Sequence, residues 1–103
     1  MCAIHGYCWQ DKKLIGEMLC KAHHRGPDGQ GTFFNNDISL CHNLLSITDT
    51  PNVSKQPWEH NDLVLVYNGE IYNHMNLRKS LDYKFKTDTD TETLAVGLEK
   101  KGI

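Results

Sequence analysis

The chain has 103 residues, of which 39% are hydrophobic, so it supports one small domain with a modest core. Thirteen acidic and eleven basic side chains give a net charge of −2 without long runs of one sign, which argues against nucleic acid and an anionic membrane as partners. No apolar stretch approaches the length of a membrane span and the N-terminus lacks a signal-peptide pattern, so we expect a cytoplasmic protein.

The first predicted elements are a strand and a helix. Residues 2–9 alternate loosely between apolar and polar side chains, which predicts a strand. Residues 11–24 predict an amphipathic helix with Asp11 as a candidate N-cap. The apolar side chains at helical spacing are Leu14, Met18 and Leu19.

Two strands around a polar turn come next. The glycines and the proline of residues 24–29 break regular structure before them. Residues 32–34 and 38–47 predict strands joined by a turn at residues 35–37. The polar, proline-containing residues 49–62 predict a loop.

The second half begins with an apolar segment. Residues 63–67 form a continuous apolar run, which predicts a strand buried on both faces. We expect a short helix from Asn73 or His74 to Leu81, and then a brief strand at residues 83–86.

A final helix completes the predicted order. Either Thr89 or Asp90 is expected to cap it. Its predicted inner face consists of Thr91, Leu94, Ala95 and Leu98. The whole pattern is typical of a mixed α/β or α+β domain.

Cys2 directly follows the initiator methionine. Removal of Met1 would leave a thiol and a free α-amine on one residue. An α-amine with a pKa of about 7.7–8.0 can act as the base that activates the thiol. Cys2 is therefore a candidate N-terminal nucleophile, provided that the chain also supplies an oxyanion hole and a substrate clamp.

The other cysteines and the histidines leave a metal site as an alternative. Cys20 with His23 and His24, and Cys41 with His42, have side chains that can bind zinc. However, the chain has no CxxC pair, and one set lies at a predicted helix end while the other lies in a predicted strand. We therefore expect buried thiols and surface imidazoles, with no metal, and no disulfides in a reducing compartment.

Four segments carry the residues with chemical potential. They read MCAIHG at the start, HRGPDG at 24–29, NGEIYN at 68–73 and TDTDTE at 87–92. Taken together, they closely resemble the N-terminal glutaminase domain of class II glutamine amidotransferases, specifically the asparagine synthetase branch. The resemblance extends through essentially all 103 residues, including residues 42–49 and 56–57, and indicates one glutamine amidotransferase domain over residues 1–103.

The resemblance implies a fold and a reaction. The fold is the α+β sandwich of N-terminal-nucleophile hydrolases, with two antiparallel sheets between helix layers and only its first part in this chain. The reaction is hydrolysis of glutamine to glutamate and ammonia through a thioester on Cys2, and it needs no cofactor. The side-chain amide of Asn68 and the N–H of Gly69 would form the oxyanion hole, where one fixed donor can contribute about 2.7–4 kcal/mol.

The resemblance also implies residues that bind the substrate. Asp90, with Glu70 as a second contact, would accept the α-amino group of glutamine. The alternatives from the residues themselves are that Asp90 is only a helix N-cap and Glu70 a solvated charge. Arg25 and Asp28 are expected to organise the loop near the nucleophile, as an ion pair.

One position departs from the family pattern. Leu44 stands where related domains place an arginine that clamps the α-carboxylate of glutamine, close to Ile47 at another substrate-binding position. Leucine has no donor, whereas a charge-assisted contact contributes about 1.5–3 kcal/mol. We therefore expect glutamine affinity to be lower on the order of ten- to a hundredfold.

The chain is also shorter than its relatives, which continue with further strands and an ATP-dependent synthetase domain. We expect the missing layer to come from a second copy or another chain, or the product to be marginally stable. Three functions follow: a glutaminase domain partnered with an asparagine synthetase-like synthetase domain, a non-catalytic remnant or regulatory module of the same fold, and a small metal-binding protein.

Overall fold

The computed structural model describes residues 2–46 and 55–102 as an α+β arrangement of helices and antiparallel sheets. No helix in these two ranges is long and apolar enough to cross a membrane. The elements in chain order are β1 (Ala3–Tyr7), α1 (Lys12–Lys21), a 3₁₀ turn (His23–Arg25), β2 (Gly29–Phe34), β3 (Ser39–Leu44), β4 (Trp58–His60), β5 (Leu63–Leu65), α2 (His74–Leu77), a second 3₁₀ turn (Arg78–Ser80) and α3 (Asp90–Lys101).

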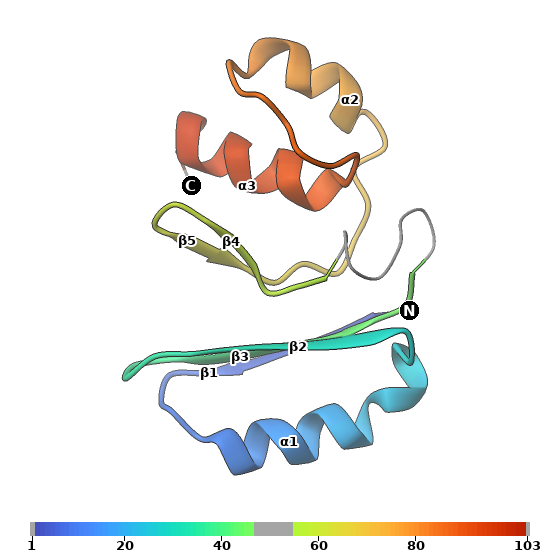
Figure 1. Cartoon of the computed structure of the whole chain (residues 1–103), viewed down its shortest axis with the longest axis vertical. Helices are drawn as coiled ribbons and strands as arrows, with labels where there is room; N and C mark the ends of the chain where they lie inside the picture. The colour runs from blue at the N-terminus through green and yellow to red at the C-terminus, as the bar shows by residue number, and fades with distance from the viewer. Residues whose placement is uncertain (1, 47–54, 103) are drawn as a thin grey trace.

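Helix α1 covers one face of a three-stranded sheet with the order β1-β3-β2 (Figure 1). The helix begins where predicted, because the Asp11 side chain accepts the Leu14 N–H at 2.9 Å. Ile15 and Leu19, one turn apart, are buried against Cys41 of β3. Of the apolar residues at helical spacing, Leu19 is buried, whereas Leu14 and Met18 are half-buried because Ile15 takes the central position.

Strands β2 and β3 form the predicted hairpin. The Asn35 side chain accepts the N–H groups of Asp37 and Ile38 at 2.9 and 2.8 Å, which fixes the turn. Strand β2 starts three residues earlier than predicted, because Gly29 already pairs with Leu44. Among the described residues β3 ends at Leu44, and Ile47 lies outside the described residues.

The second sheet consists of β4 and β5. The expected loop at 49–62 is wrong at Trp58–His60, which pairs with Leu63–Leu65 across a tight turn, and residues 49–54 lie outside the described part. Asn61 allows this turn by adopting a φ of 51°. Strand β5 is shorter than predicted and half-buried, not buried on both faces, because the described sheet has only two strands.

In the C-terminal part of the chain the two predicted helices are present, but the predicted strand between them is not. Helix α2 starts at His74 with Asn73 before it, and the 3₁₀ turn Arg78–Ser80 continues it. Residues 83–86 are not a strand, since the Lys86 N–H donates to the Glu92 carboxylate instead of to a neighbouring strand.

Thr89 is the N-cap of α3, with its side chain accepting the Glu92 N–H at 3.3 Å. This settles the choice between Thr89 and Asp90, which is the first residue of the helix. Ala95 and Val96 are fully buried, whereas the predicted inner residues Leu94 and Leu98 are half-buried.

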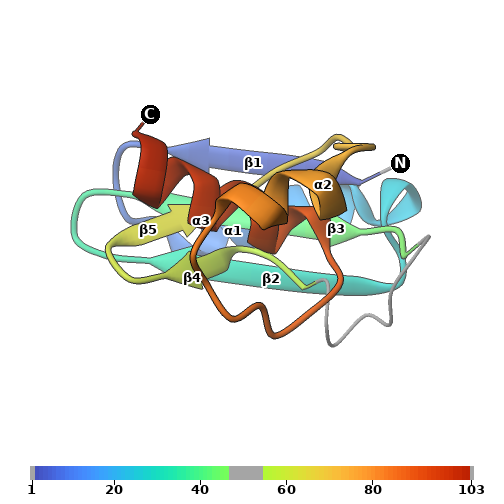
Figure 2. The same cartoon turned by 90° about the horizontal axis from the view of Figure 1, so that it is seen from above.

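The layers follow one another as α1, the three-stranded sheet, the β4-β5 sheet and α3, with α2 beyond α3 (Figure 1). Seen from above, β4 and β5 lie over the β2 side of the larger sheet, away from β1 (Figure 2). The exposure of three paired residues is consistent with this position of β4 and β5. Gly31 on β2 pairs with His42 on β3, and His42 pairs with Ile4 on β1. His42 is 1% exposed and Ile4 is 43% exposed, so the second layer covers β2 and β3 but leaves Ile4 open.

Strand β2 and the segment before β4 come very close together at Gly31. A Cβ atom there would lie 1.7 Å from the backbone oxygen of Gln56, so Gly31→Ala forces the backbone apart. We expect Gly31→Ala to lower the free energy of unfolding by about 1–3 kcal/mol, as overpacking does. Chemical denaturation measures this.

Gly16 provides the matched control for that substitution. It lies on α1, and a Cβ atom there would meet nothing within 4 Å. Gly16→Ala should therefore stabilise the protein by about 0.5–1 kcal/mol, because alanine favours the helix. If both variants had the same stability as the parent protein, the close contact at Gly31 would be contradicted.

Candidate active site

Cys2 lies at the start of β1, beside the end of β3. Ala3 pairs with Asn43, so Cys2 is next to Leu44 and Leu45 as they leave the strand. The Leu45 N–H donates to Cys2 Sγ at 3.3 Å, and the Leu45 carbonyl oxygen lies 3.7 Å from the same sulfur. The side chain is half-buried. The backbone of Leu45 thus holds the Cys2 sulfur on both sides, as an acceptor from its N–H and beside its carbonyl oxygen.

Asn68 reaches Cys2 from the other half of the chain. Its Nδ2 donates a hydrogen bond to the Cys2 backbone oxygen at 3.1 Å, across 66 residues of sequence. An amide nitrogen carries two hydrogens, so this bond leaves a second donor on Asn68. The structure therefore places an amide donor beside the cysteine.

Gly69 is covered by the ring of Tyr67. A Cβ atom on Gly69 would lie 2.8 Å from the Tyr67 hydroxyl oxygen and 2.9 Å from two ring carbons, so a side chain at this position would displace the ring. Burial raises the pKa of the Tyr67 hydroxyl, and the negative charges of Asp90 and Glu70 raise it further. Tyr67 therefore interacts electrostatically with both carboxylates. We did not predict it, although an aromatic residue directly before Asn68-Gly69 was a usable signal.

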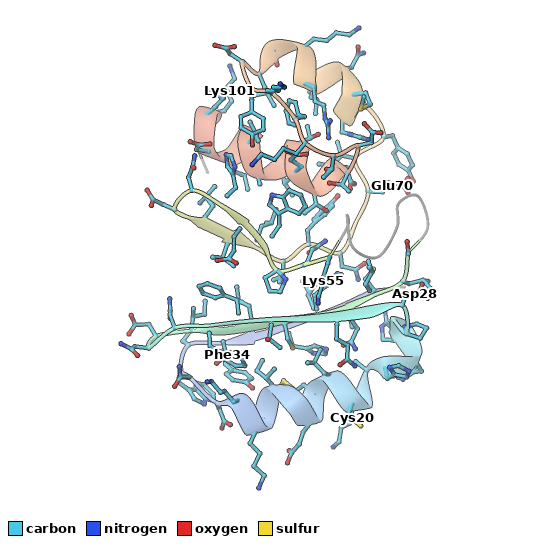
Figure 3. All side chains as sticks on the ribbon, viewed as in Figure 1. Cys20, Asp28, Phe34, Lys55, Glu70 and Lys101 are labelled. Atoms are coloured by element: carbon cyan, nitrogen blue, oxygen red, sulfur yellow. The ribbon has the colours of Figure 1, made fainter. Side chains whose placement is uncertain are left out.

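Asp90 is tied to the segment that contains Asn68 and Gly69. Its Oδ2 accepts the Ile71 N–H at 2.9 Å, which brings the start of α3 to residues 68–71. The interpretation of Asp90 as only an N-cap is wrong, since Thr89 has that role. Glu70 is exposed, on the same side of the view as Asp28 but in the other half of the molecule (Figure 3).

Asp28 organises the loop after α1, but without Arg25. Its Oδ2 accepts the Ser46 N–H at 2.8 Å, and its own N–H donates to the Leu44 carbonyl at 2.9 Å. The predicted ion pair between Arg25 and Asp28 is wrong: within the described ranges, His60–Glu99 is the one ion pair. The reason is that the Asp28 carboxylate faces the end of β3, while Arg25 is exposed in the 3₁₀ turn.

Leu44 is buried at the end of β3, with its side chain against Gly29. Because Leu45 contacts the Cys2 sulfur, Leu44 lies one residue from the candidate nucleophile. Ile47, the other predicted residue of this segment, lies outside the described residues.

The structure thus brings Cys2, Asn68 and Asp90 into one connected region, with Leu44 and Asp28 along its edge. A cavity of about 460 Å³ lies elsewhere, between β2 and the segment 55–57, and none of the predicted site residues lines it. The predicted site and this cavity are therefore separate.

The cysteines and histidines of the metal alternative point in different directions. Cys41 is buried against α1, and His42, the next residue along the strand, faces the opposite side of the sheet. Cys20 is exposed on α1 (Figure 3). In residues 2–46 and 55–102, no group of three or more His, Cys, Asp or Glu residues is arranged to hold a metal ion.

Comparison with known families defines the class of this protein. The family model described as glutamine amidotransferase domain matches residues 1–103. The chain belongs to this family.

Individual relatives place the resemblance more narrowly. The chain is 41% identical to asparagine synthetase 1 (glutamine-hydrolyzing) of Arabidopsis thaliana over 84% of its length, and 40% identical to that of Bacillus subtilis over 81%. A candidate glutamine-hydrolyzing asparagine synthetase of Methanocaldococcus jannaschii is 33% identical over the whole chain. The chain spans 15%, 14% and 25% of these three relatives, respectively.

Proposed function

We propose that this chain is a glutaminase domain that hydrolyses the side-chain amide of glutamine to glutamate and ammonia. The observation that carries the proposal is the contact between Asn68 Nδ2 and the Cys2 carbonyl, because it joins a candidate nucleophile to a candidate oxyanion donor. The family match over residues 1–103 supports the same function.

The proposed reaction begins after removal of Met1 frees the α-amine of Cys2. Cys2 Sγ attacks the amide carbon of glutamine, and the thiol proton passes through the α-amine to the leaving nitrogen. The C–S bond forms, the C–N bond breaks and ammonia leaves. Water then hydrolyses the thioester, which releases glutamate and restores the thiol.

The oxyanion of each tetrahedral intermediate would be held by Asn68 and Gly69. The second hydrogen of Asn68 Nδ2 and the N–H of Gly69 are the proposed donors. Asp90 and Glu70 would accept the α-amino group. Besides burial, their negative charges raise the pKa of the hydroxyl of Tyr67, whose ring covers Gly69. Leu44 offers no donor to the α-carboxylate.

The fold and the partners belong to the same proposal. The order helix, sheet, sheet, helix supports an N-terminal-nucleophile sandwich (Figure 1). The exposed Ile4 on the inner face of β1 supports completion by a second copy or by a further chain. We propose an asparagine synthetase-like synthetase domain as the recipient of ammonia, in the cytoplasm.

A glutamate-release assay tests the function. Protein whose Met1 removal has been verified by mass spectrometry is incubated with glutamine beside a Cys2→Ala variant. We expect glutamate from the parent protein and none above background from Cys2→Ala, because alanine cannot form the thioester. Equal release from the two would favour the non-catalytic module instead.

A further inference from the structure

The segment directly before Asp90 is held by Arg78, from the 3₁₀ turn after α2. Nη1 and Nη2 of Arg78 donate to the carbonyl oxygens of Thr87 and Thr89, each at 2.7 Å. Nε donates to the Thr93 hydroxyl at 2.7 Å. The face of the guanidinium lies over the Phe85 ring, with Cζ 4.1 Å from the ring centroid. The edge of the guanidinium therefore donates hydrogen bonds, and its face packs on an aromatic ring.

Glu92 holds the same segment through its N–H groups and a hydroxyl. It is 1% exposed, and its Oε1 accepts the N–H and the hydroxyl of Thr87, both at 2.7 Å. The Lys86 N–H donates to the same carboxylate at 3.0 Å. The carbonyl groups of Thr87 and Thr89 thus bind a cation, while the N–H groups of Lys86 and Thr87 bind an anion. This arrangement fixes both the position and the direction of the segment.

The segment determines where the Asp90 carboxylate lies. The Thr89 carbonyl that Arg78 holds belongs to the peptide bond that enters Asp90. From that peptide, Asp90 extends Oδ2 to the Ile71 N–H at 2.9 Å. A displacement of the Thr89 carbonyl therefore moves the carboxylate relative to residues 68–71.

We propose that Arg78 is a positioning residue that sets the affinity of the site for the α-amino group of the substrate, acting through Asp90. This inference rests on the proposed function, in which Asp90 binds that amine. Lysine cannot replace Arg78. The planar guanidinium directs separate N–H groups at the Thr87 carbonyl, the Thr89 carbonyl and the Thr93 hydroxyl, whereas lysine has a single ammonium nitrogen.

Arg78→Lys is the first test, with Lys79→Met as the matched control. We expect Arg78→Lys to raise the KM for glutamine on the order of tenfold with little change in kcat, because the amine contact is made equally in the ground state and the transition state. Lys79 is the exposed neighbouring residue, and Lys79→Met should change neither constant.

A double-mutant cycle separates positioning from a general structural effect. Asp90→Asn removes the charge through which Arg78 is proposed to act. In an Asp90→Asn background, Arg78→Lys should change KM less than about twofold. A full, additive tenfold effect in that background would overturn the inference. If Arg78→Lys does not fold, Thr93→Val, which removes one acceptor of the guanidinium, should raise KM in the same direction.

Amide hydrogen exchange tests the positioning role of Arg78 without relying on glutaminase activity. Absence of glutamate release from the parent protein would contradict the function, but Ile71 still reports on Asp90, since its N–H binds Oδ2. We expect the Ile71 amide to exchange faster in Arg78→Lys than in Lys79→Met. Unchanged Ile71 exchange in folded Arg78→Lys would overturn the inference.

Discussion

Replacing Leu44 with arginine is expected to lower the KM for glutamine on the order of ten- to a hundredfold. Leu44 lies at the end of β3, next to Leu45, whose N–H binds the Cys2 sulfur. An arginine there would offer a planar pair of donors to the α-carboxylate of a substrate bound at Cys2. Steady-state kinetics of glutamate release measure the change.

Leu44→Met is the matched control, because methionine keeps an apolar side chain of similar volume without a donor. Its KM should equal that of the parent protein. Leu44 is 4% exposed, so the arginine also introduces a charge where the parent protein has none, and we expect Leu44→Arg to be less stable than Leu44→Met in the absence of substrate. If a folded Leu44→Arg variant showed an unchanged KM, the carboxylate would bind elsewhere.

The second large effect concerns pH and His42. Burial, followed by the charge of His5, lowers the pKa of His42 from 6.5 to about 4. His42 Nε2 is buried and has no hydrogen-bond partner among the residues that the structure describes. The fold therefore holds the neutral imidazole, and the unfolded chain takes up a proton at a higher pH than the folded chain does.

The sign of the pH effect follows from that difference. The stability that neutral His42 preserves is fully present above pH 6.5 and is lost as the pH falls toward 4. The pKa difference corresponds to about 3 kcal/mol in the free energy of unfolding. Urea unfolding at pH 7.5 and 4.5, in the parent protein and in His42→Leu, measures it.

We expect His42→Leu to lose much less stability than the parent protein between these two pH values. His24→Gln is the control, since His24 is exposed and its removal should leave the pH dependence intact. The same loss of stability on acidification in His42→Leu and in the parent protein would show that other groups carry the pH dependence.

Local rules predicted the helix starts and the hairpin well. Asp11 caps α1 because a short acidic side chain can accept the N–H three residues along, and Asn35 closes its turn by the same chemistry. Strand β4 was missed because three polar and aromatic residues form a strand only through pairing with β5. Pairing is a tertiary property that the segment itself does not display.

The sequence predicts the residues of the candidate site but not the contacts between them. Cys2, Asn68 and Asp90 came from a resemblance in four motifs, whereas their connection depends on how the two sheets face each other. Arg25 and Asp28 are close in sequence, yet Asp28 binds Ser46 and forms no ion pair with Arg25. Arg78 had no signal before the structure, because its partners are mainly backbone carbonyls.

The hydrogen bond between Asn68 and the Cys2 carbonyl has a consequence for how the proposed activity would be lost. Cys2 directly precedes β1 of the three-stranded sheet, whereas Asn68 follows β5 of the two-stranded sheet. Any partial separation of the layers would divide the candidate nucleophile from the proposed oxyanion donor while each sheet stayed intact. The proposed glutaminase activity would then disappear at lower denaturant concentrations than the helical signal, and its loss would report the separation of the two sheets.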